Sequence, residues 1–229
     1  TCSNTRSSTG NGACNCAGNS ASTGISNGAT HHARTATMPE SNLSYTLTYF
    51  DFPGRGEPVR LAFAIGGIPF ENRTVTGAEF AAMKSAGELP YGSVPVLDIH
   101  DGENTTRVAQ HVALLRYVGR LAGLYPTDPI EALKVDEATY FADEFGQCIF
   151  AAMAPMRYGF APYANDEEKA AMRQRLAAEV LPKLLAKLNT IIEGNGSGFV
   201  VGPSITIADL KWYFHIGMVL SGFVDDIPP

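Results

Sequence analysis

A tyrosine hydroxyl and an arginine guanidinium stand on either side of a short turn between two apolar stretches. Tyr49 closes an alternation of apolar and polar residues, Arg55 follows the turn residue Gly54, and Pro58 opens the next stretch. A hydroxyl can donate a hydrogen bond and a guanidinium always carries a positive charge, so such a pair can hold a small acidic ligand. Each residue alone also has a plainer interpretation, because Tyr49 could be a packed strand aromatic and Arg55 a solvated turn residue.

The overall composition limits which partners the chain can have. Of its 229 residues 45% are hydrophobic and 17% are charged, and the formal net charge is -6. A broad nucleic-acid surface needs clustered lysine and arginine, and this acidic balance argues against one. The best membrane candidate, residues 145–156, is shorter than the roughly 20 residues that a membrane helix needs. We therefore expect a soluble protein that binds neither nucleic acid nor a membrane.

The cysteines favour a reducing compartment, and so a cytoplasmic location. Cys2, Cys14 and Cys16 lie at the start of the chain and Cys148 stands alone in the rest, which is not the pattern of a disulfide framework. Cys14-x-Cys16 could be half of a metal site, but no histidine or cysteine at ligand spacing completes it. No metal is expected.

Residues 1–37 have a composition that cannot form a core. They are almost entirely Ser, Thr, Asn, Gly, Ala and Cys, and they contain no Asp or Glu. We therefore predict a disordered low-complexity leader over residues 1–40, with Met38 as a natural start. A transit peptide is the weaker interpretation, because the segment holds two arginines and no amphipathic stretch.

The regular part of the chain begins near residue 43 and has the pattern of an α/β unit. Apolar alternation predicts strands, and apolar stripes at helical spacing predict helices. The predicted order is strand, helix, strand, helix, strand, strand, helix, as in a βαβ half and a ββα half that share one sheet. These elements are expected over residues 45–49, 58–65, 70–75, 79–85, 94–99, 104–109 and 112–125.

Two features define the third and fourth predicted strands. Pro95 cannot donate a hydrogen bond within a sheet, so it is out of place inside the strand at 94–99. A cis Val94–Pro95 bond at the strand entrance would remove this conflict. Asp101-Gly102 then predicts a two-residue hairpin that leads into the strand at 104–109.

After a linker at residues 125–129 the pattern predicts helices only. Two helices are expected over 130–153 and 166–192, and a third begins near Thr206. Thr206-x-x-Asp209 has the spacing of a capping box, in which a hydroxyl and a carboxylate satisfy N–H groups at a helix start. His215 lies within this last apolar helix and is expected to be a core residue.

Several short motifs occur in a specific order along this framework. They are Tyr49-Phe50 before Gly54-Arg55, Val94-Pro95-Val96-Leu97, Gln110 at a helix start, RYVGRLAGLYP at 116–126, and Thr206-x-Ala208-Asp209. The ordered set resembles the cytosolic glutathione S-transferases, most of all the sigma class, which includes haematopoietic-type prostaglandin D synthases. The resemblance implies an α/β thioredoxin-like glutathione-binding domain over residues 41–124, followed by an all-α helical bundle domain over residues 130–229. The second domain stops about one or two helices short of the family's length, and we expect it to be truncated.

The resemblance assigns catalysis to Tyr49 and Arg55. The tyrosine hydroxyl of the family donates a hydrogen bond to the glutathione sulfur, and the arginine adds positive potential beside it. A free thiol has a pKa of about 8.5, and lowering it by about two units requires about 2.7 kcal/mol. One hydrogen bond to a charged acceptor contributes about 1.5 to 3 kcal/mol, so Tyr49 could supply most of this.

The resemblance also implies contacts with the middle and the glycyl end of glutathione. The backbone of Val94, before the family's cis proline Pro95, pairs with the cysteinyl part like an added strand. Phe80 and Lys84 fall where the class has a tryptophan and a lysine that reach the glycyl carboxylate. Ser93 replaces a longer polar side chain, so it and Phe80 imply weaker glutathione affinity.

The γ-glutamyl end is assigned to Gln110 and His111. They stand at a helix N-terminus, where N–H groups and the helix dipole favour a carboxylate. The family usually has a serine in place of His111, so the histidine could add a charged donor or crowd the site. Asp143 matches an acid that reaches the glutathione amine of a partner subunit, which implies a homodimer.

The resemblance places a hydrophobic substrate pocket between the turn after Tyr49 and the helix at 130–153. Its expected lining is Phe50, Arg55, Gly146 and Phe150, and Gly146 in place of a larger side chain is expected to widen it. The favoured hypothesis is a detoxifying glutathione transferase whose thiolate attacks small hydrophobic electrophiles. A glutathione-dependent isomerase of the prostaglandin D synthase kind and a non-catalytic glutathione-binding or structural relative stay open as alternatives.

Overall fold

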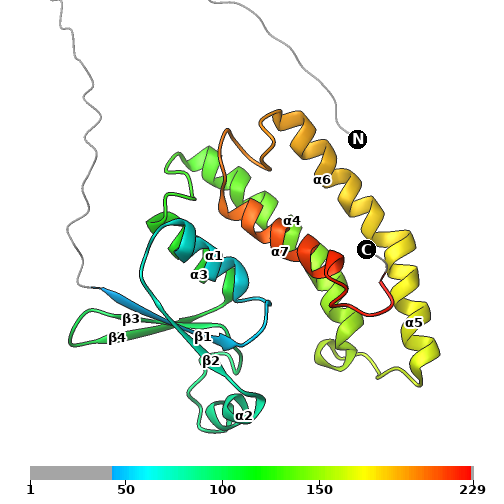
Figure 1. Cartoon of the computed structure of the whole chain (residues 1–229), viewed down its shortest axis with the longest axis horizontal. Coiled ribbons are helices and arrows are strands. Elements are labelled where there is room, and N and C mark those ends of the chain that lie inside the picture. Colours follow the sequence, from blue (N-terminus) through cyan, green and yellow to red (C-terminus); the bar gives the residue numbers. More distant parts are fainter. Residues whose placement is uncertain (1–42, 228–229) are drawn as a thin grey trace, which may run out of the picture. The chain divides into compact units, whose positions relative to one another are not determined.

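A four-stranded mixed sheet lies in the first half of the described chain (Figure 1). The structure is a computed structural model that describes residues 43–227, so the predicted leader and its three cysteines lie outside the described residues. The strand order is β2-β1-β3-β4, with β1 and β2 parallel and the other two pairs antiparallel. The strands are β1 (Ser44–Phe50), β2 (Glu71–Val75), β3 (Val96–His100) and β4 (Thr105–Ala109).

Three helices accompany the sheet, and the first is the crossover that parallel β1 and β2 require. Pro58 stands in its first turn, where a missing N–H costs nothing, and the helix ends at Gly66. Its buried Phe63 packs with Leu47 of β1 in the main core. The helices are α1 (Glu57–Ile65), α2 (Gly77–Ser85) and α3 (His111–Leu121).

The predicted elements of this half are confirmed, and so is the cis Val94–Pro95 bond. The predicted length of the hairpin turn is wrong. β3 and β4 are joined by the four residues 101–104, because the Asp101 N–H donates to the Asn104 carbonyl oxygen at 3.1 Å and the Asn104 N–H donates to Asp101 Oδ1 at 2.8 Å. The aspartate side chain thus closes a wider turn than Asp-Gly alone would form.

Residues 129–220 contain helices and no strand. The long helix predicted over 166–192 is interrupted by a π-helical turn, η2 (Leu176–Val180). Pro182 follows this turn, and a proline offers no N–H to the carbonyl one turn earlier and crowds it. The other elements are α4 (Pro129–Met153), η1 (Pro155–Tyr158), α5 (Asp166–Arg175), α6 (Leu181–Asn195) and α7 (Ile207–Leu220).

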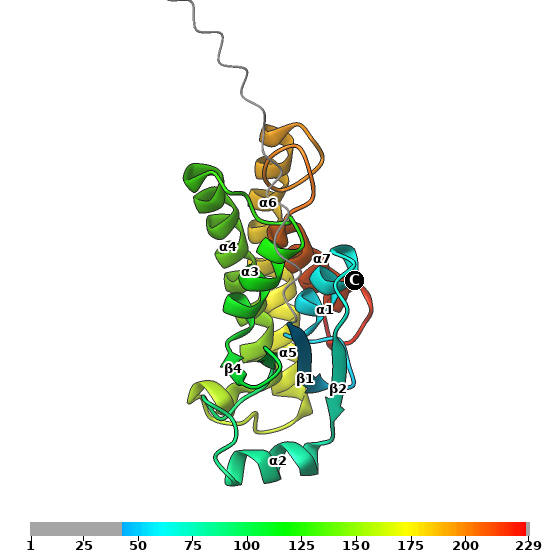
Figure 2. The same cartoon turned by 90° about the vertical axis from the view of Figure 1, so that its left-hand side faces the viewer.

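Helix α7 joins the two halves of the described chain. It packs along α4 and also contacts α1 and α3, and Figure 2 shows it beside α1. The Ile207 N–H donates to the Leu124 carbonyl oxygen at 3.0 Å, and Gly119 of α3 lies directly against Ile207. The described residues belong to one compact unit, so the division into domains at 125–129 stays a prediction. Within residues 43–227, none of the helices has the length and apolarity needed to cross a membrane.

Candidate active site

Tyr49 lies near the carboxyl end of β1 with its side chain almost entirely buried. Only 6% of the residue is exposed. The backbone N–H of Arg55 donates a hydrogen bond to Tyr49 Oη at 2.9 Å. The hydroxyl oxygen acts as the acceptor in this bond, so its own hydrogen is free to be donated to another group.

The environment of Tyr49 keeps that hydrogen in place at neutral pH. Burial raises the pKa of Tyr49 above its ordinary value of 10.0, while the Arg55 N–H and the positive charges of Arg55, Arg60 and Arg157 oppose this rise. The Arg60 guanidinium carbon lies 5.5 Å from the centre of the tyrosine ring. A phenol with a raised pKa stays protonated through the neutral range and remains a hydrogen-bond donor.

Two glycines allow the turn after β1 to pass close to Tyr49. A Cβ atom added at Gly54 would run into Tyr49 Oη, and one added at Gly56 would lie 2.7 Å from Cγ of the same ring. Gly56 has φ of -79°, so space and not backbone conformation requires glycine there. This close approach brings the Arg55 N–H onto the hydroxyl.

The Arg55 side chain is held by the helical half of the chain. Its Nη2 donates to Tyr158 Oη at 2.9 Å, and its guanidinium carbon lies 4.6 Å from the centre of the Phe150 ring. The structure therefore brings together Arg55 and Phe150, both predicted for the hydrophobic pocket. A guanidinium over an aromatic face is attracted by the negative face of the ring, which favours this position of Arg55.

A cavity of about 390 Å³ opens beside Phe50. Four of the residues predicted for ligand contact line it together, although they come from β1, α2 and the approach to β3. Arg157 of η1 also lines this cavity, and residues 43–227 offer it no ion-pair partner. The lining is Phe50, Phe80, Lys84, Tyr91, Gly92, Ser93, Val94 and Arg157.

Gln110 has an unusual backbone conformation at the start of α3. Its φ is 77° and its ψ is 101°, a region that non-glycine residues rarely adopt. No side chain caps this helix start. The first N–H groups of α3 have no partner within the helix, so they can bind an anion.

The His111 ring turns toward α4. Its Nε2 lies 3.1 Å from Asp143 Oδ1, and the same oxygen lies 2.7 Å from Lys211 Nζ. Burial lowers the pKa of His111, although hydrogen bonding to Asp143 acts in the opposite direction. A neutral imidazole that donates Nε2–H to a carboxylate has only a lone pair left on Nδ1. Of the two alternatives for His111, the charged donor is therefore not favoured at neutral pH, and its backbone N–H is what remains for a carboxylate.

Comparison with known proteins identifies the family of the chain. Residues 155–227 match the family described as Glutathione S-transferase, C-terminal domain. Over 168 residues the chain is 36% identical to Glutathione S-transferase 1 of Ascaris suum, and the match covers 72% of this chain and 75% of that protein. The chain belongs to the glutathione S-transferase family.

Other relatives of this glutathione S-transferase include prostaglandin D synthases. The chain is 32% identical over 169 residues to the hematopoietic prostaglandin D synthase of Gallus gallus, covering 74% of this chain and 76% of that protein. A solved structure of prostaglandin synthase D of Nilaparvata lugens matches with a TM-score of 0.68 and 27% identity, covering 80% of this chain and 85% of that one. The predicted fold class, a thioredoxin-like α/β domain followed by a helical domain, is confirmed.

Two residues predicted for this transferase's sites lie in surroundings that the sequence did not indicate. Gly146 is buried on α4, and a Cβ atom there would run into the His215 ring. His215 therefore fills the space of the missing side chain, and the expected widening of the pocket is not found. Asp143 has 16% of its side chain exposed. Its Oδ1 lies at ion-pair distance from both His111 Nε2 and Lys211 Nζ of its own chain.

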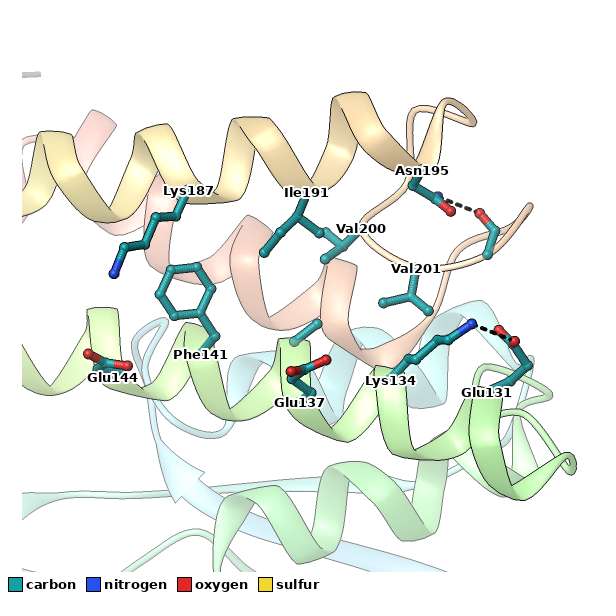
Figure 3. A pocket seen from close by; sticks show the side chains of 12 residues that line it. Glu131, Lys134, Glu137, Phe141, Glu144, Lys187, Ile191, Asn195, Val200 and Val201 are labelled. Carbon is teal, nitrogen blue, oxygen red and sulfur yellow. Dashed lines mark hydrogen bonds and ion pairs between the residues drawn. The ribbon is translucent and has the colours of Figure 1, made fainter.

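A larger cavity of this glutathione S-transferase lies elsewhere among the described residues. It has a volume of about 850 Å³ and is bordered by α4, α6 and residues 200–202 (Figure 3). None of the residues predicted for glutathione or for the electrophile lines it. Apolar Phe141 and Ile191 face each other across it, and Lys134 and Glu131 form an ion pair of 3.0 Å at one edge. Size alone therefore does not identify the active site here.

The closeness of Gly54 to Tyr49 Oη gives a first prediction. We expect Gly54→Ala to displace the hydroxyl and to lower kcat for glutathione conjugation about tenfold, the loss of roughly one hydrogen bond to a charged group. Initial rates at saturating glutathione measure this. Gly194→Ala on α6 is the matched control, because no atom lies within 4 Å of the added methyl group. An undiminished kcat in Gly54→Ala would contradict the placement of the hydroxyl.

The contact between Gly146 and His215 gives a second prediction. Gly146→Ala forces a methyl group into the buried ring, and overpacking of this kind costs about 1 to 3 kcal/mol. We expect a lower free energy of unfolding in urea. Combining it with His215→Ala should recover part of the loss, since the smaller side chain makes room. A Gly146→Ala variant as stable as the natural chain would show that α4 and α7 are not in close contact at Gly146 and His215.

Proposed function

We propose that this chain is a glutathione transferase in which Tyr49 donates a hydrogen bond to the sulfur of bound glutathione. Its membership of the glutathione S-transferase family supports the reaction class. The environment of the Tyr49 hydroxyl is the observation that supports this role most. Its oxygen accepts a hydrogen bond from the Arg55 N–H at 2.9 Å, and burial raises the pKa of Tyr49. Such a group stays a donor at neutral pH, and the N–H behind it makes its O–H a stronger donor.

The energy required of this site is modest. Lowering the pKa of a thiol from about 8.5 to about 6.5 needs about 2.7 kcal/mol. A hydrogen bond to a charged acceptor supplies about 1.5 to 3 kcal/mol. Arg55 and Arg157 add positive potential, since both act on the tyrosine hydroxyl beside which the sulfur would lie. Hydrogen bond and charge together suffice for a thiolate at neutral pH.

The arrangement of polar groups suits the three parts of glutathione in this proposal. Lys84 and Arg157 line the cavity of about 390 Å³ and bind the glycyl carboxylate. The backbone of Val94, before cis Pro95, pairs with the cysteinyl part. The uncapped start of α3 at Gln110 binds the γ-glutamyl carboxylate through backbone N–H groups.

The reaction is a nucleophilic displacement in this proposal. The thiolate sulfur forms a bond to an electrophilic carbon of a small hydrophobic substrate, and the leaving group departs with its electron pair. The thiol proton has gone to solvent before this step. Phe50, Phe150 and Arg55 border the space that the electrophile occupies, and Phe50 stacks on Phe52 at 5.4 Å. The enzyme works as a cytoplasmic homodimer in detoxification.

A glutathione-dependent isomerase is the second candidate, because prostaglandin D synthases are among the relatives. Conjugation of glutathione to a chlorodinitrobenzene, followed by absorbance of the product, tests the transferase with the full chain. An endoperoxide substrate tests the isomerase. Glutathione binding in calorimetry without either reaction would point to the non-catalytic relative and would overturn the proposed function.

A further inference from the structure

Four titratable side chains from α3, α4 and α7 lie together in one cluster: His111, Asp143, Lys211 and His215. Lys211 Nζ and His111 Nε2 lie 2.7 Å and 3.1 Å from Asp143 Oδ1. Lys211 and His215 are completely buried, with 0% of each exposed. The proposed reaction uses only the backbone of His111, so it does not explain why charged groups lie here.

The packing of α4 and α7 is built around this cluster. Lys211 and His215 are four residues apart on α7 and share one helix face. Asp143 and Gly146 are three residues apart on α4 and face them. Asp143 pairs with the lysine, and the absence of a side chain at Gly146 makes room for the histidine ring. Apolar residues usually stabilise such a position better than a buried ion pair, which favours a role beyond stability.

The charges of the cluster determine the state of the His111 ring. Burial would raise the pKa of Asp143, but the hydrogen bond with His111 and the charge of Lys211 together hold it far below its usual range, so the carboxylate is ionised. Burial lowers the pKa of Lys211 to about 8, which leaves it mostly charged at neutral pH. Arg55 and His215 also face the cluster; burial lowers the pKa of His215 to about 3 and keeps it neutral. Asp143 thus has its counter-charge in Lys211.

A neutral His111 beside this carboxylate must donate its Nε2–H to it. This bond fixes both the tautomer and the direction of the ring. His111 is the first residue of α3 and follows Gln110, whose φ of 77° is unfavourable for a residue with a side chain. Such a conformation persists only where the surroundings hold it, and the ring of the next residue, His111, is bonded to Asp143 of α4.

We propose that Asp143 and Lys211 are positioning residues for glutathione binding, which anchor the His111 ring and thereby hold the Gln110–His111 turn that binds the γ-glutamyl carboxylate. This inference rests on the proposed function of the chain. It gives Asp143 a role within its own chain, in place of the contact with a partner subunit's glutathione that the family resemblance implies. Neither Asp143 nor Lys211 touches glutathione in this account.

The test removes the ion pair without leaving a buried charge. In Asp143→Leu combined with Lys211→Met we expect the KM for glutathione to rise about tenfold, with a smaller change in kcat at saturation, because a misplaced turn binds glutathione less well. Thermal melting should be unchanged or higher, since apolar replacements of a buried pair are often neutral or stabilising. Glu131→Leu combined with Lys134→Met removes an exposed α4 ion pair and serves as the control.

A second variant keeps the inference testable if the double variant does not fold. His111→Leu should raise the KM by a similar factor, and its effect should not add to that of the double variant, because both break the same anchor. An unchanged KM in the folded double variant or in His111→Leu would overturn the inference.

A glutathione analogue without its α-amine separates positioning from direct contact. If Asp143 positions the turn, the natural chain and the double variant should differ for this analogue by the same factor as for glutathione. If the difference disappears, Asp143 binds the amine directly and the inference is wrong. Failure of the proposed function itself would appear separately, as absence of conjugation in the natural chain.

Discussion

Replacing Tyr49 by phenylalanine should lower the rate of glutathione conjugation between about tenfold and about a hundredfold at neutral pH. The variant loses one hydrogen bond to a thiolate, which contributes about 1.5 to 3 kcal/mol, and each 1.36 kcal/mol changes a rate about tenfold. The pKa of the bound thiol should rise toward that of the free thiol. Activity in the variant should therefore recover as the pH approaches about 8.5, and the pH–rate profile measures this shift.

The control for this variant lies on the same strand. Tyr45 is also buried, with 7% exposed, and packs against Phe63 with ring centres 5.5 Å apart. Tyr45→Phe removes a hydroxyl from β1 without touching the proposed sulfur site, so we expect nearly unchanged rates. Glutathione binding by Tyr49→Phe should be largely preserved. Full activity of Tyr49→Phe at neutral pH would remove Tyr49 from the mechanism.

The largest effect on stability is expected from Asp209→Ala at the start of α7. Asp209 Oδ1 accepts the Val200 N–H at 2.8 Å, and Oδ2 accepts the Thr206 N–H at 2.8 Å and the Thr206 hydroxyl at 2.9 Å. Val200 and Thr206 are buried, so their N–H groups would lose these acceptors away from water. Loss of the cap and the unsatisfied donors should together cost about 3 kcal/mol.

Denaturant unfolding of the full chain measures this loss. The melting temperature should fall by about 6 to 12 °C for a chain of this size. Glu79→Ala is the matched control, because Glu79 closes the same kind of capping box at Thr76 of α2 but is exposed. We expect a much smaller change there. An Asp209→Ala variant as stable as Glu79→Ala would contradict the account of α7 as the element that joins the two halves.

Much of the fold follows from local patterns in the sequence. Alternation at Tyr45 and Tyr49 predicts β1, Gly66 predicts the end of α1, and Thr206 with Asp209 predicts the start of α7. These signals are local, because each acts through the backbone of neighbouring residues. The π-helical turn η2 was not predicted, since the apolar spacing before Pro182 continues as in an ordinary helix.

The site is less accessible to sequence reasoning, because its parts come from distant segments. The family resemblance indicated Phe50, Phe80, Lys84 and Val94, which line one cavity, although their contacts with glutathione stay predictions. Arg157 carries no such signal: only the packing of η1 brings it to that cavity. Its neighbour Tyr158 reaches Arg55 in the same way.

One signal for the buried cluster was present in the sequence. Lys211 and His215 are two ionisable residues at helical spacing within a stretch that is otherwise almost entirely apolar. That spacing predicts a shared face, and a shared face in a buried helix predicts a partner of opposite charge. Identifying the partner as Asp143 requires the packing of α7 on α4, which no local pattern gives.

Ultraviolet difference spectra of glutathione bound to the full chain, recorded from about pH 5 to about pH 9, test the central claim most directly. We expect a thiolate band that persists well below the pKa of the free thiol and is lost in Tyr49→Phe, while both proteins bind glutathione. Binding of glutathione without that band, or a band that Tyr49→Phe retains, would show that this chain does not activate the thiol through Tyr49.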